Sequence, residues 1–184
     1  MVTAKGISSM YAPLAAVTVS DEVNEPFAEG GAAFVHGFTN GGHPVASAAG
    51  LAVIDVLEED GLIENSADVG AYLHSQRDVL LAHPTIADVR GAGLMMVPEV
   101  VSNKETMEFF PWDAHAERKL QSTALRNGLA FHTTLYRARR PEGHKRGLPM
   151  FIAPPLCITR EQVDDMMERL DTTLTEWERD LGMG

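Results

Sequence analysis

The 184-residue chain has little of several features that would assign a protein to a class at once. Its single cysteine, Cys157, excludes an internal disulfide framework and is typical of a reducing compartment, so we expect a cytoplasmic protein. No apolar run reaches the roughly 18 residues that a membrane-spanning helix needs. No charged segment followed by an apolar one opens the chain as a signal peptide would. We therefore expect a soluble protein with no membrane partner.

Basic side chains are also scarce, with 15 lysines and arginines against 26 acidic residues and a net charge of -11. Binding along a nucleic-acid backbone needs basic stripes, so a nucleic-acid partner is not expected. His36 and His43 lie in one glycine-rich segment, but no third His, Cys or carboxylate stands at a ligand spacing, so no metal is expected either. Cys157 is predicted to be a small buried core residue rather than a nucleophile, because free cysteine is usually buried and inert.

Lys5 is the residue whose chemistry draws attention first. It is the only lysine before Lys104, and its small neighbours Ala4 and Gly6 put little bulk beside its amine. A lysine amine that is desolvated loses its proton more readily and can then attack a carbonyl to form a Schiff base. Most lysines are solvated, however, so Lys5 considered alone leaves both interpretations open.

The first third of the chain predicts few regular elements. Residues 14–19 form a short apolar run that we interpret as a buried strand, and residues 21–33 predict a loop or short helix. Glycines keep residues 38–44 irregular, and Pro44 then starts a helix that Gly61 ends. The beginning of this helix is apolar on nearly every side, which predicts that it is buried.

The remainder predicts a small α/β subdomain in which strands and helices alternate. An amphipathic helix after Gly61 should end before Pro84, and Asp113 could cap a later helix. Thr159 and Gln162 form a capping box at the start of the last helix. The other predicted elements are strands at 86–90, 94–101, 129–135 and 149–153, a helix at 114–126, and an apolar stripe of Val163, Met166, Met167, Leu170, Leu174 and Trp177.

Several motifs together resemble the class III aminotransferases, which are fold-type I enzymes that use pyridoxal 5'-phosphate (PLP). They begin with Ala-Lys-Gly-Ile-Ser-Ser-Met-Tyr-Ala-Pro-Leu at residues 4–14, continue with Gly-Phe-Thr and Gly-His-Pro at residues 37–44, and recur in family order at 83–84, 89–95, 127–129 and 154–159. The resemblance implies an α/β fold. Residues 1–60 would be the C-terminal part of the PLP-binding large domain, and residues 61–184 the C-terminal small α/β domain.

The resemblance gives Lys5 and Thr39 their expected roles. Lys5 would form the Schiff base with PLP and then move a proton between the substrate carbon and the cofactor's C4' carbon. Thr39 lies among glycines, where a hydroxyl and backbone N–H groups can converge on a phosphate. The family's threonine at this position reaches the cofactor phosphate of the partner subunit in a homodimer. A threonine that only stabilises the turn is the alternative.

Recognition of the substrate is expected from a basic loop at residues 137–147. Its guanidinium groups can bind a carboxylate bidentately, and many family members use a mobile arginine in this region. His132 stands where that arginine usually follows the Gly-Leu strand. Either a loop arginine replaces it, or the substrate is an amine, or the loop is merely solvated. The candidates for substrate binding are Tyr11, His132, Arg137, Arg139, Arg140 and Arg146.

The expected reaction is transfer of an amino group from an ω-amino acid or amine to an α-keto acid such as pyruvate. A PLP-dependent aminomutase or decarboxylase is the alternative, because Lys5 would serve those reactions equally well. The family's phosphate cup, and the aspartate that pairs with the pyridine nitrogen, precede the lysine. Only four residues precede Lys5 here. We therefore expect the C-terminal portion of a larger enzyme, inactive alone, with a non-catalytic fragment as a further alternative.

Overall fold

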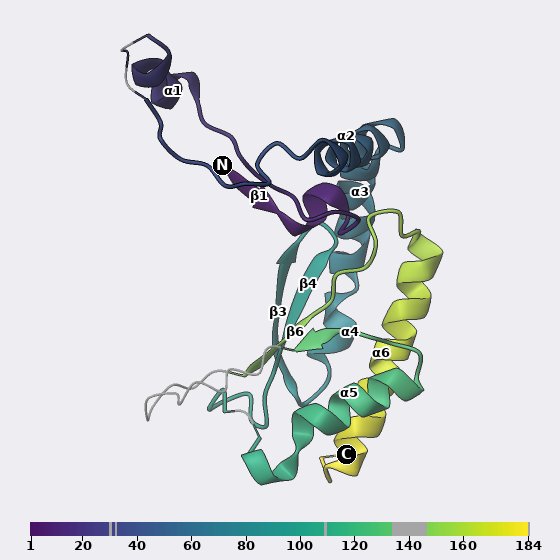
Figure 1. Cartoon of the computed structure of the whole chain (residues 1–184). Helices are drawn as coiled ribbons and strands as arrows, with labels where there is room; N and C mark the ends of the chain where they lie inside the picture. Colours follow the sequence, from purple (N-terminus) through teal and green to yellow (C-terminus); the bar gives the residue numbers. More distant parts are fainter. Residues whose placement is uncertain (30, 32, 109, 134–146, 184) are drawn as a thin grey trace. The chain divides into compact units, whose positions relative to one another are not determined.

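The computed structural model describes residues 1–29, 31, 33–108, 110–133 and 147–183. By their internal contacts the residues divide into two compact units, Met1–Leu62 and Ile63–Gly184. Figure 1 labels the helices and strands of both units. The predicted boundary at residue 60 lies close to this division. The assignment of the two parts to a large and a small domain remains a prediction.

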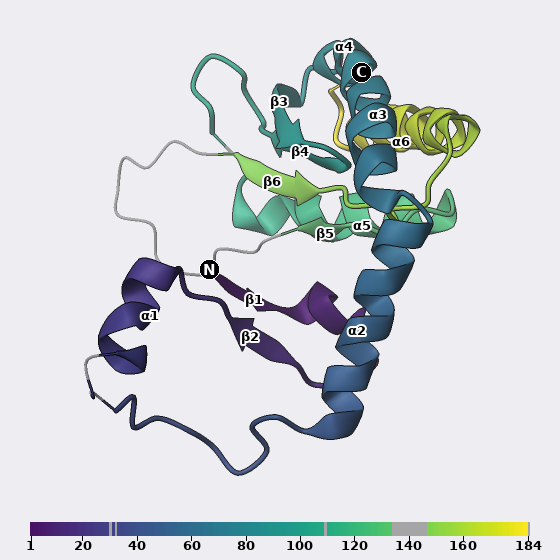
Figure 2. The same ribbon diagram turned by 90° about the horizontal axis from the view of Figure 1, so that it is seen from above.

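The first unit is built on a two-stranded antiparallel hairpin. Figure 2 shows its strands lying side by side next to helix α2. The register pairs Val2 with Val17 and Ala4 with Ala15, and the amide of Thr18 donates to the carbonyl of Met1. The predicted strand at 14–19 is therefore present but short. The elements of this unit are β1 (Val2–Ala4), the 3-10 helix η1 (Lys5–Ser8), β2 (Ala15–Val17), α1 (Asp21–Ala28) and α2 (Pro44–Glu59).

Helix α2 forms where the sequence predicts it, but its beginning is not buried. Pro44 occupies the first turn, and His43 Nδ1 accepts a hydrogen bond of 3.4 Å from the amide of Ala46. Ala46 and Gly50 are the only buried residues of the helix, whereas Val45 is 69% exposed. The prediction of a buried helix start was thus wrong for this unit. The reason is that the described residues of the unit cover α2 mainly around Gly50, where η1 packs against it.

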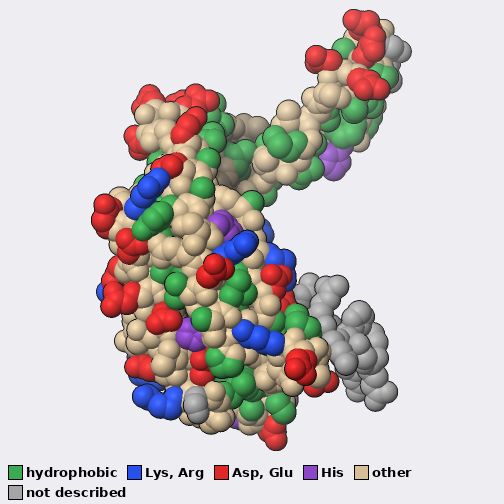
Figure 3. All heavy atoms as spheres, turned by 180° about the vertical axis from the view of Figure 1, so that it is seen from behind, with side chains coloured by type: hydrophobic (Ala, Val, Ile, Leu, Met, Phe, Trp, Pro, Cys, Tyr) green, Lys and Arg blue, Asp and Glu red, His purple; other side chains and the backbone are tan. Residues whose placement is uncertain are grey.

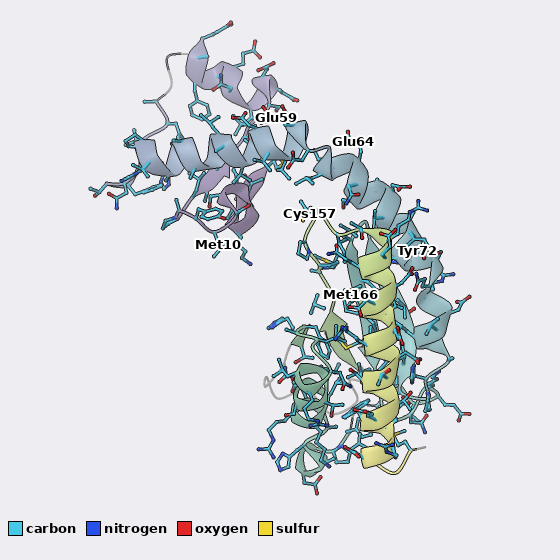
Figure 4. All side chains as sticks on the ribbon, turned by 90° about the vertical axis from the view of Figure 1, so that its right-hand side faces the viewer. Met10, Glu59, Glu64, Tyr72, Cys157 and Met166 are labelled. Atoms are coloured by element: carbon cyan, nitrogen blue, oxygen red, sulfur yellow. The ribbon has the colours of Figure 1, made fainter. Side chains whose placement is uncertain are left out.

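The second unit contains an antiparallel sheet with the strand order β3-β4-β6-β5. Helix α6 carries the predicted capping box, and its predicted apolar stripe is buried at every position except Met166, which is partly buried (Figure 4). The bounds are α3 (Leu62–Ser75), α4 (Arg77–Leu81), β3 (Ile86–Ala92), β4 (Met95–Val100), η2 (Trp112–Ala114), α5 (Ala116–Arg126), β5 (His132–Thr133), β6 (Leu148–Phe151) and α6 (Arg160–Asp180).

Two helix boundaries in this unit differ from prediction. The helix expected to run up to Pro84 is interrupted at Gln76, whose backbone leaves the helical region between α3 and α4. The helix expected to be capped by Asp113 begins only at Ala116. His115 precedes it in a left-handed conformation, which places Asp113 in the short helix η2 instead. In both cases the backbone conformation of one residue sets the boundary of a helix, while the apolar pattern that predicts the helix is unchanged.

Cys157 is exposed, so the prediction that it is a core residue was wrong. It lies in a turn closed by a 3.0 Å hydrogen bond from the amide of Ile158 to the carbonyl of Pro155. Asn65 Nδ2 stabilises this turn by donating hydrogen bonds to the carbonyls of Leu156 and Ile158. The turn directs Ile158 into the core and leaves Leu156 and Cys157 outside, as Figure 4 shows for Cys157.

Candidate functional site

Lys5 is the first residue of η1 and follows strand β1 directly. Its backbone is left-handed, with φ at 57°. Ser9 and Met10, which follow the same short helix, are also left-handed, with φ at 45° and 65°. Residues other than glycine seldom adopt this conformation, and such outliers concentrate at functional sites. The segment that carries the predicted catalytic lysine is therefore unusual in its backbone as well as in its sequence.

Ser8 lies inside this segment and was not predicted to be a site residue. Ser8 is 1% exposed, and its hydroxyl donates a 2.6 Å hydrogen bond to the carbonyl of Ala12. Its own carbonyl accepts from the amide of Tyr11 at 2.9 Å. A serine whose hydroxyl bonds to nearby backbone is a common device in turns, and the Ser-Ser pair before Met10 was the available signal.

The Lys5 side chain suits attachment of a carbonyl compound. It is exposed, and within the described residues its ammonium has no recorded hydrogen bond or ion pair that would have to be broken. Gly6 adds no bulk, since a Cβ built there would meet nothing within 4 Å. The residues present therefore fit the attachment of an aldehyde such as that of PLP. None of the described residues buries the amine.

Thr39 lies in a different part of the same unit. It is exposed in the turn before α2, where the amide of Gly41 donates to the carbonyl of Phe38 at 2.9 Å and Gly42 has a positive φ. The segment of Lys5 instead packs against α2 around Gly50, two turns further along the helix. Among the described residues no hydrogen bond is recorded between Lys5 and Thr39. Thr39 and Lys5 are thus placed at different positions along α2.

The candidate substrate-binding residues are only partly placed. Tyr11 is 87% exposed and shares the loop of Lys5. His132 lies in β5 of the second unit, where it is exposed and its ring is 6.1 Å from that of Phe151. The remaining candidates, Arg137, Arg139, Arg140 and Arg146, lie outside the described residues. The structure therefore brings only Tyr11 into the same segment as Lys5.

A separate buried polar cluster lies in the second unit around His83. Its Nδ1 is 2.9 Å from a carboxylate oxygen of Glu178, and its Nε2 is 3.0 Å from Asp171. The hydroxyl of Thr85 also donates to Glu178. The hydrogen bond to the Glu178 carboxylate, followed by the one to Asp171, raises the pKa of His83. Burial would raise the pKa of Glu178, but the hydrogen bonds from His83 and Thr85 outweigh it and lower that pKa.

Acidic side chains are spread over the face drawn in Figure 3. Within the described residues, no group of three or more His, Cys, Asp and Glu side chains could hold a metal ion. No helix among the same residues is both long enough and apolar enough to cross a bilayer.

Comparisons with known proteins agree with the arrangement of these elements. The family model for "Aminotransferase class-III" matches residues 1–174. The (S)-enantioselective ω-transaminase of Thermomicrobium roseum superposes with a TM-score of 0.81 at 38% identity, covering 96% of this chain and 37% of that protein. An amine transaminase from an uncultivated Pseudomonas species, solved in its PLP-bound form, gives a TM-score of 0.80 at 30% identity, with coverage of 95% and 38%.

A curated relative points to the same family. The putrescine–pyruvate aminotransferase of Pseudomonas aeruginosa is 36% identical over 168 residues, which are 91% of this chain and 34% of that protein. The fold is that of the fold-type I PLP-dependent transferases. Within that class, the chain belongs to the class III aminotransferases. It spans a little over a third of the length of the proteins that it matches.

Proposed function

We propose that the chain contributes the catalytic lysine and part of the phosphate site to a PLP-dependent transaminase. The enzyme would act in the cytoplasm and transfer an amino group from an amine or ω-amino acid to an α-keto acid such as pyruvate. The observation that carries the proposal is Lys5, whose amine has no hydrogen bond or ion pair to any described residue and which occupies a left-handed backbone position in a chain of the class III family. The name of the P. aeruginosa relative, which pairs putrescine with pyruvate, supports this choice of donor and acceptor.

Lys5 attaches the cofactor and moves the proton in this proposal. Bound PLP supplies an electron sink for the carbon that carries the amino group. With PLP and the amino donor bound, the Nζ of Lys5 would be the base that accepts a proton from that carbon and the acid that later donates it to another atom of the bound molecule. The accessible Lys5 amine and the absence of bulk at Gly6 leave room for this exchange. Tyr11, exposed in the same loop, is proposed to contact the substrate.

Thr39 is proposed to bind the cofactor phosphate of a partner subunit in a homodimer. Thr39 is exposed in a glycine-rich turn directly before a helix, the kind of position at which backbone N–H groups and a hydroxyl can converge on a phosphate. Its separation along α2 from the Lys5 segment supports action at another site. The apolar residues exposed on α2, including Val45 and Leu51, support an interface at this helix.

The carboxylate of the keto acid is proposed to bind an arginine of the 137–146 loop. Arginine forms two parallel hydrogen bonds with a carboxylate, which an exposed imidazole such as His132 cannot do. The alternative activity, an aminomutase or a decarboxylase, would use Lys5 in the same way. Product analysis distinguishes the three reactions, because only transamination leaves the amino group on the added keto acid.

The test joins residues 1–184 to the remaining part of the T. roseum transaminase, in place of the segment that they match. Borohydride reduction in the presence of PLP, followed by peptide mapping, should give one adduct at Lys5. Lys5→Ala should abolish the adduct and turnover, while Lys104→Ala, which changes the next lysine of the chain, should alter neither. An undiminished adduct in Lys5→Ala would overturn the proposal. The 184-residue chain alone should show no turnover, and robust transamination by it would contradict the expected dependence on the remaining part.

A further inference from the structure

We propose that Ser8 is a positioning residue that holds the Lys5 segment in its left-handed conformation. The inference rests on the proposed function of Lys5 and assigns a role to a residue that does not itself touch the cofactor. Figure 2 shows the short helix that carries Lys5 and Ser8 beside α2, at the end of strand β1.

The hydroxyl of Ser8 closes the loop that follows η1. It donates to the carbonyl of Ala12 across four residues at 2.6 Å, while the Ser8 carbonyl accepts from the amide of Tyr11 at 2.9 Å. Within the described residues, this is the only side-chain hydrogen bond recorded between residues 4 and 14. Ser8 is 1% exposed, so water cannot readily replace a partner that is lost. A single buried hydroxyl therefore holds the two ends of the loop together.

The loop needs this constraint because of its backbone. Lys5, Ser9 and Met10 are all left-handed although none of them is glycine. Such conformations are unfavourable for residues with a Cβ and persist only where the surrounding structure imposes them. The amide of Ser9 bonds to the carbonyl of Gly6 at 3.0 Å, which links the left-handed pair at 9 and 10 to the turn that begins at Lys5.

A second anchor lies next to Ser8. A Cβ built at Gly50 of α2 would lie 2.5 Å from Leu14 Cδ2 and 3.7 Å from the carbonyl oxygen of Ile7, so both ends of the loop approach the helix closely there. Ile7 is thus held against α2, and Ser8 holds the chain immediately after it. Lys5 is two residues before Ile7, so a change of backbone at 8–10 is transmitted to it through the single turn of η1.

The first test uses the chain as it stands, without cofactor, and compares Ser8→Ala, Ser8→Thr and Ser9→Ala by NMR. Ser9→Ala is the matched control, because it removes an exposed neighbouring hydroxyl for which no hydrogen bond is recorded. Ser8→Ala should speed amide exchange at Tyr11 by about five- to tenfold, the change expected from one hydrogen bond. It should also shift the φ-dependent couplings of Lys5 out of the left-handed range. Ser8→Thr should retain both properties of the wild type.

The second test uses the PLP-loaded fusion with the T. roseum enzyme. Ser8→Ala should keep the borohydride adduct at Lys5 but lower kcat more than it raises KM, and should shift the pH midpoint of the cofactor's absorbance band. A loss of stability alone would leave that midpoint unchanged in the folded fraction. If Ser8→Ala does not fold, Ser8→Cys replaces it, since a thiol of similar size is only a weak donor.

The two proposals fail in different ways. If the adduct survives in Lys5→Ala, the proposed function is wrong whatever Ser8 does. If the adduct requires Lys5 but Ser8→Ala matches Ser9→Ala in amide exchange, couplings and pH midpoint, only the positioning role is overturned.

Discussion

The two units of the chain differ in how far their apolar residues are buried. In Ile63–Gly184 the apolar side chains of the sheet and of α3, α5 and α6 form one continuous core, in which Leu73 and Leu174 have no exposed surface. In Met1–Leu62 the buried residues among those described are only Ser8, Ala46 and Gly50, while Val35 and Leu51 are 93% and 63% exposed.

The content of apolar residues therefore does not decide which unit can form a stable core by itself. The second unit has a four-stranded sheet that helices can cover, whereas the first has a two-stranded hairpin, which is marginal by itself. Relatives that are nearly three times as long contain much additional chain. We infer that the core of the second unit is sufficient to stabilise it, whereas the first unit needs apolar contacts beyond those that its described residues make with one another. Matched variants in the two units test this contrast, from the largest expected effect to the smallest.

Truncation of one leucine in each unit gives the largest difference. Leu174→Ala removes a fully buried side chain from the core of the second unit and should destabilise it by about 2–5 kcal/mol, because a cavity is left behind. Leu51→Ala, made on the 63% exposed face of α2, should change stability by less than about 0.5 kcal/mol. Urea unfolding followed by circular dichroism measures both. A comparable loss from Leu51→Ala in the 184-residue chain would show that the first unit already has a core.

The buried cluster at His83 should make the second unit sensitive to pH. The folded pKa of His83 is raised above its ordinary value of 6.5, so the stability that it contributes is complete below pH 6.5 and is lost as the pH rises through the folded pKa. The folded pKa of Glu178 is lowered below 4.5, so its contribution is complete above pH 4.5 and is lost as the pH falls through the folded value. Together the two groups favour the fold most between these two ordinary values.

His83→Gln should flatten this dependence on the alkaline side and cost roughly 1.5–3 kcal/mol at pH 5.5, through the loss of hydrogen bonds to charged groups. Unfolding measured from pH 4 to 9 checks both effects, and His74→Gln is the control with the same change of side chain elsewhere in the unit. The backbone amide hydrogens of the first unit should exchange at the same rates as in the wild type. A His83→Gln profile parallel to the wild type above pH 6.5 would refute the assignment.

The same contrast explains which features the sequence predicts. The helical stripe of α6 and its capping box depend on local spacing, and both are confirmed, as is the start of α2 at Pro44. The buried start of α2 was predicted from its apolar composition. Composition indicates which residues of the helix are suited to burial, but not whether other residues of the unit pack against them. The interruption at Gln76 and the exposure of Cys157 arise from single turns that no periodic pattern records.

At the site, the motif around Lys5 predicts the family, which is confirmed. The sequence could not predict the left-handed backbone at Lys5, Ser9 and Met10, because none of them is a residue that favours this conformation. Nor did it identify Ser8, whose role depends on burial and on the carbonyl of a residue four positions away. The roles of Lys5 and Thr39 remain predictions.

Replacement of a glycine in each unit should again separate them. A Cβ at Gly70 of α3 would lie 2.4 Å from the carbonyl carbon of Gly93, a backbone atom that cannot move alone, so Gly70→Ala should cost about 1–3 kcal/mol. Gly50→Ala meets only the end of the Leu14 side chain at short range and gains about 1 kcal/mol of helix propensity, so it should be nearly neutral. Thermal unfolding of the two variants provides the comparison. Equal losses would mean that α2 is as tightly packed as α3.

The smallest effect is expected from two methionines that share a backbone conformation. Met10 in the first unit and Met107 in the second are both left-handed, with φ at 65° and 58°, but Met10 is 76% exposed and Met107 is half-buried. Figure 4 shows Met10 at the outside of its segment.

Glycine adopts this conformation without the penalty of about 1–2 kcal/mol that a Cβ brings. It also increases the conformational entropy of the unfolded chain, which lowers the stability of the folded state by about 0.4–1 kcal/mol. Met10→Gly should therefore stabilise its loop by a few tenths of a kcal/mol to about 1 kcal/mol, and should slow amide exchange at Tyr11. Met107→Gly should gain less or lose stability, because it also removes a half-buried side chain. Faster exchange at Tyr11 in Met10→Gly would show that the Met10 side chain is itself a support of the Lys5 segment, and that the first unit is better packed than its exposed surface indicates.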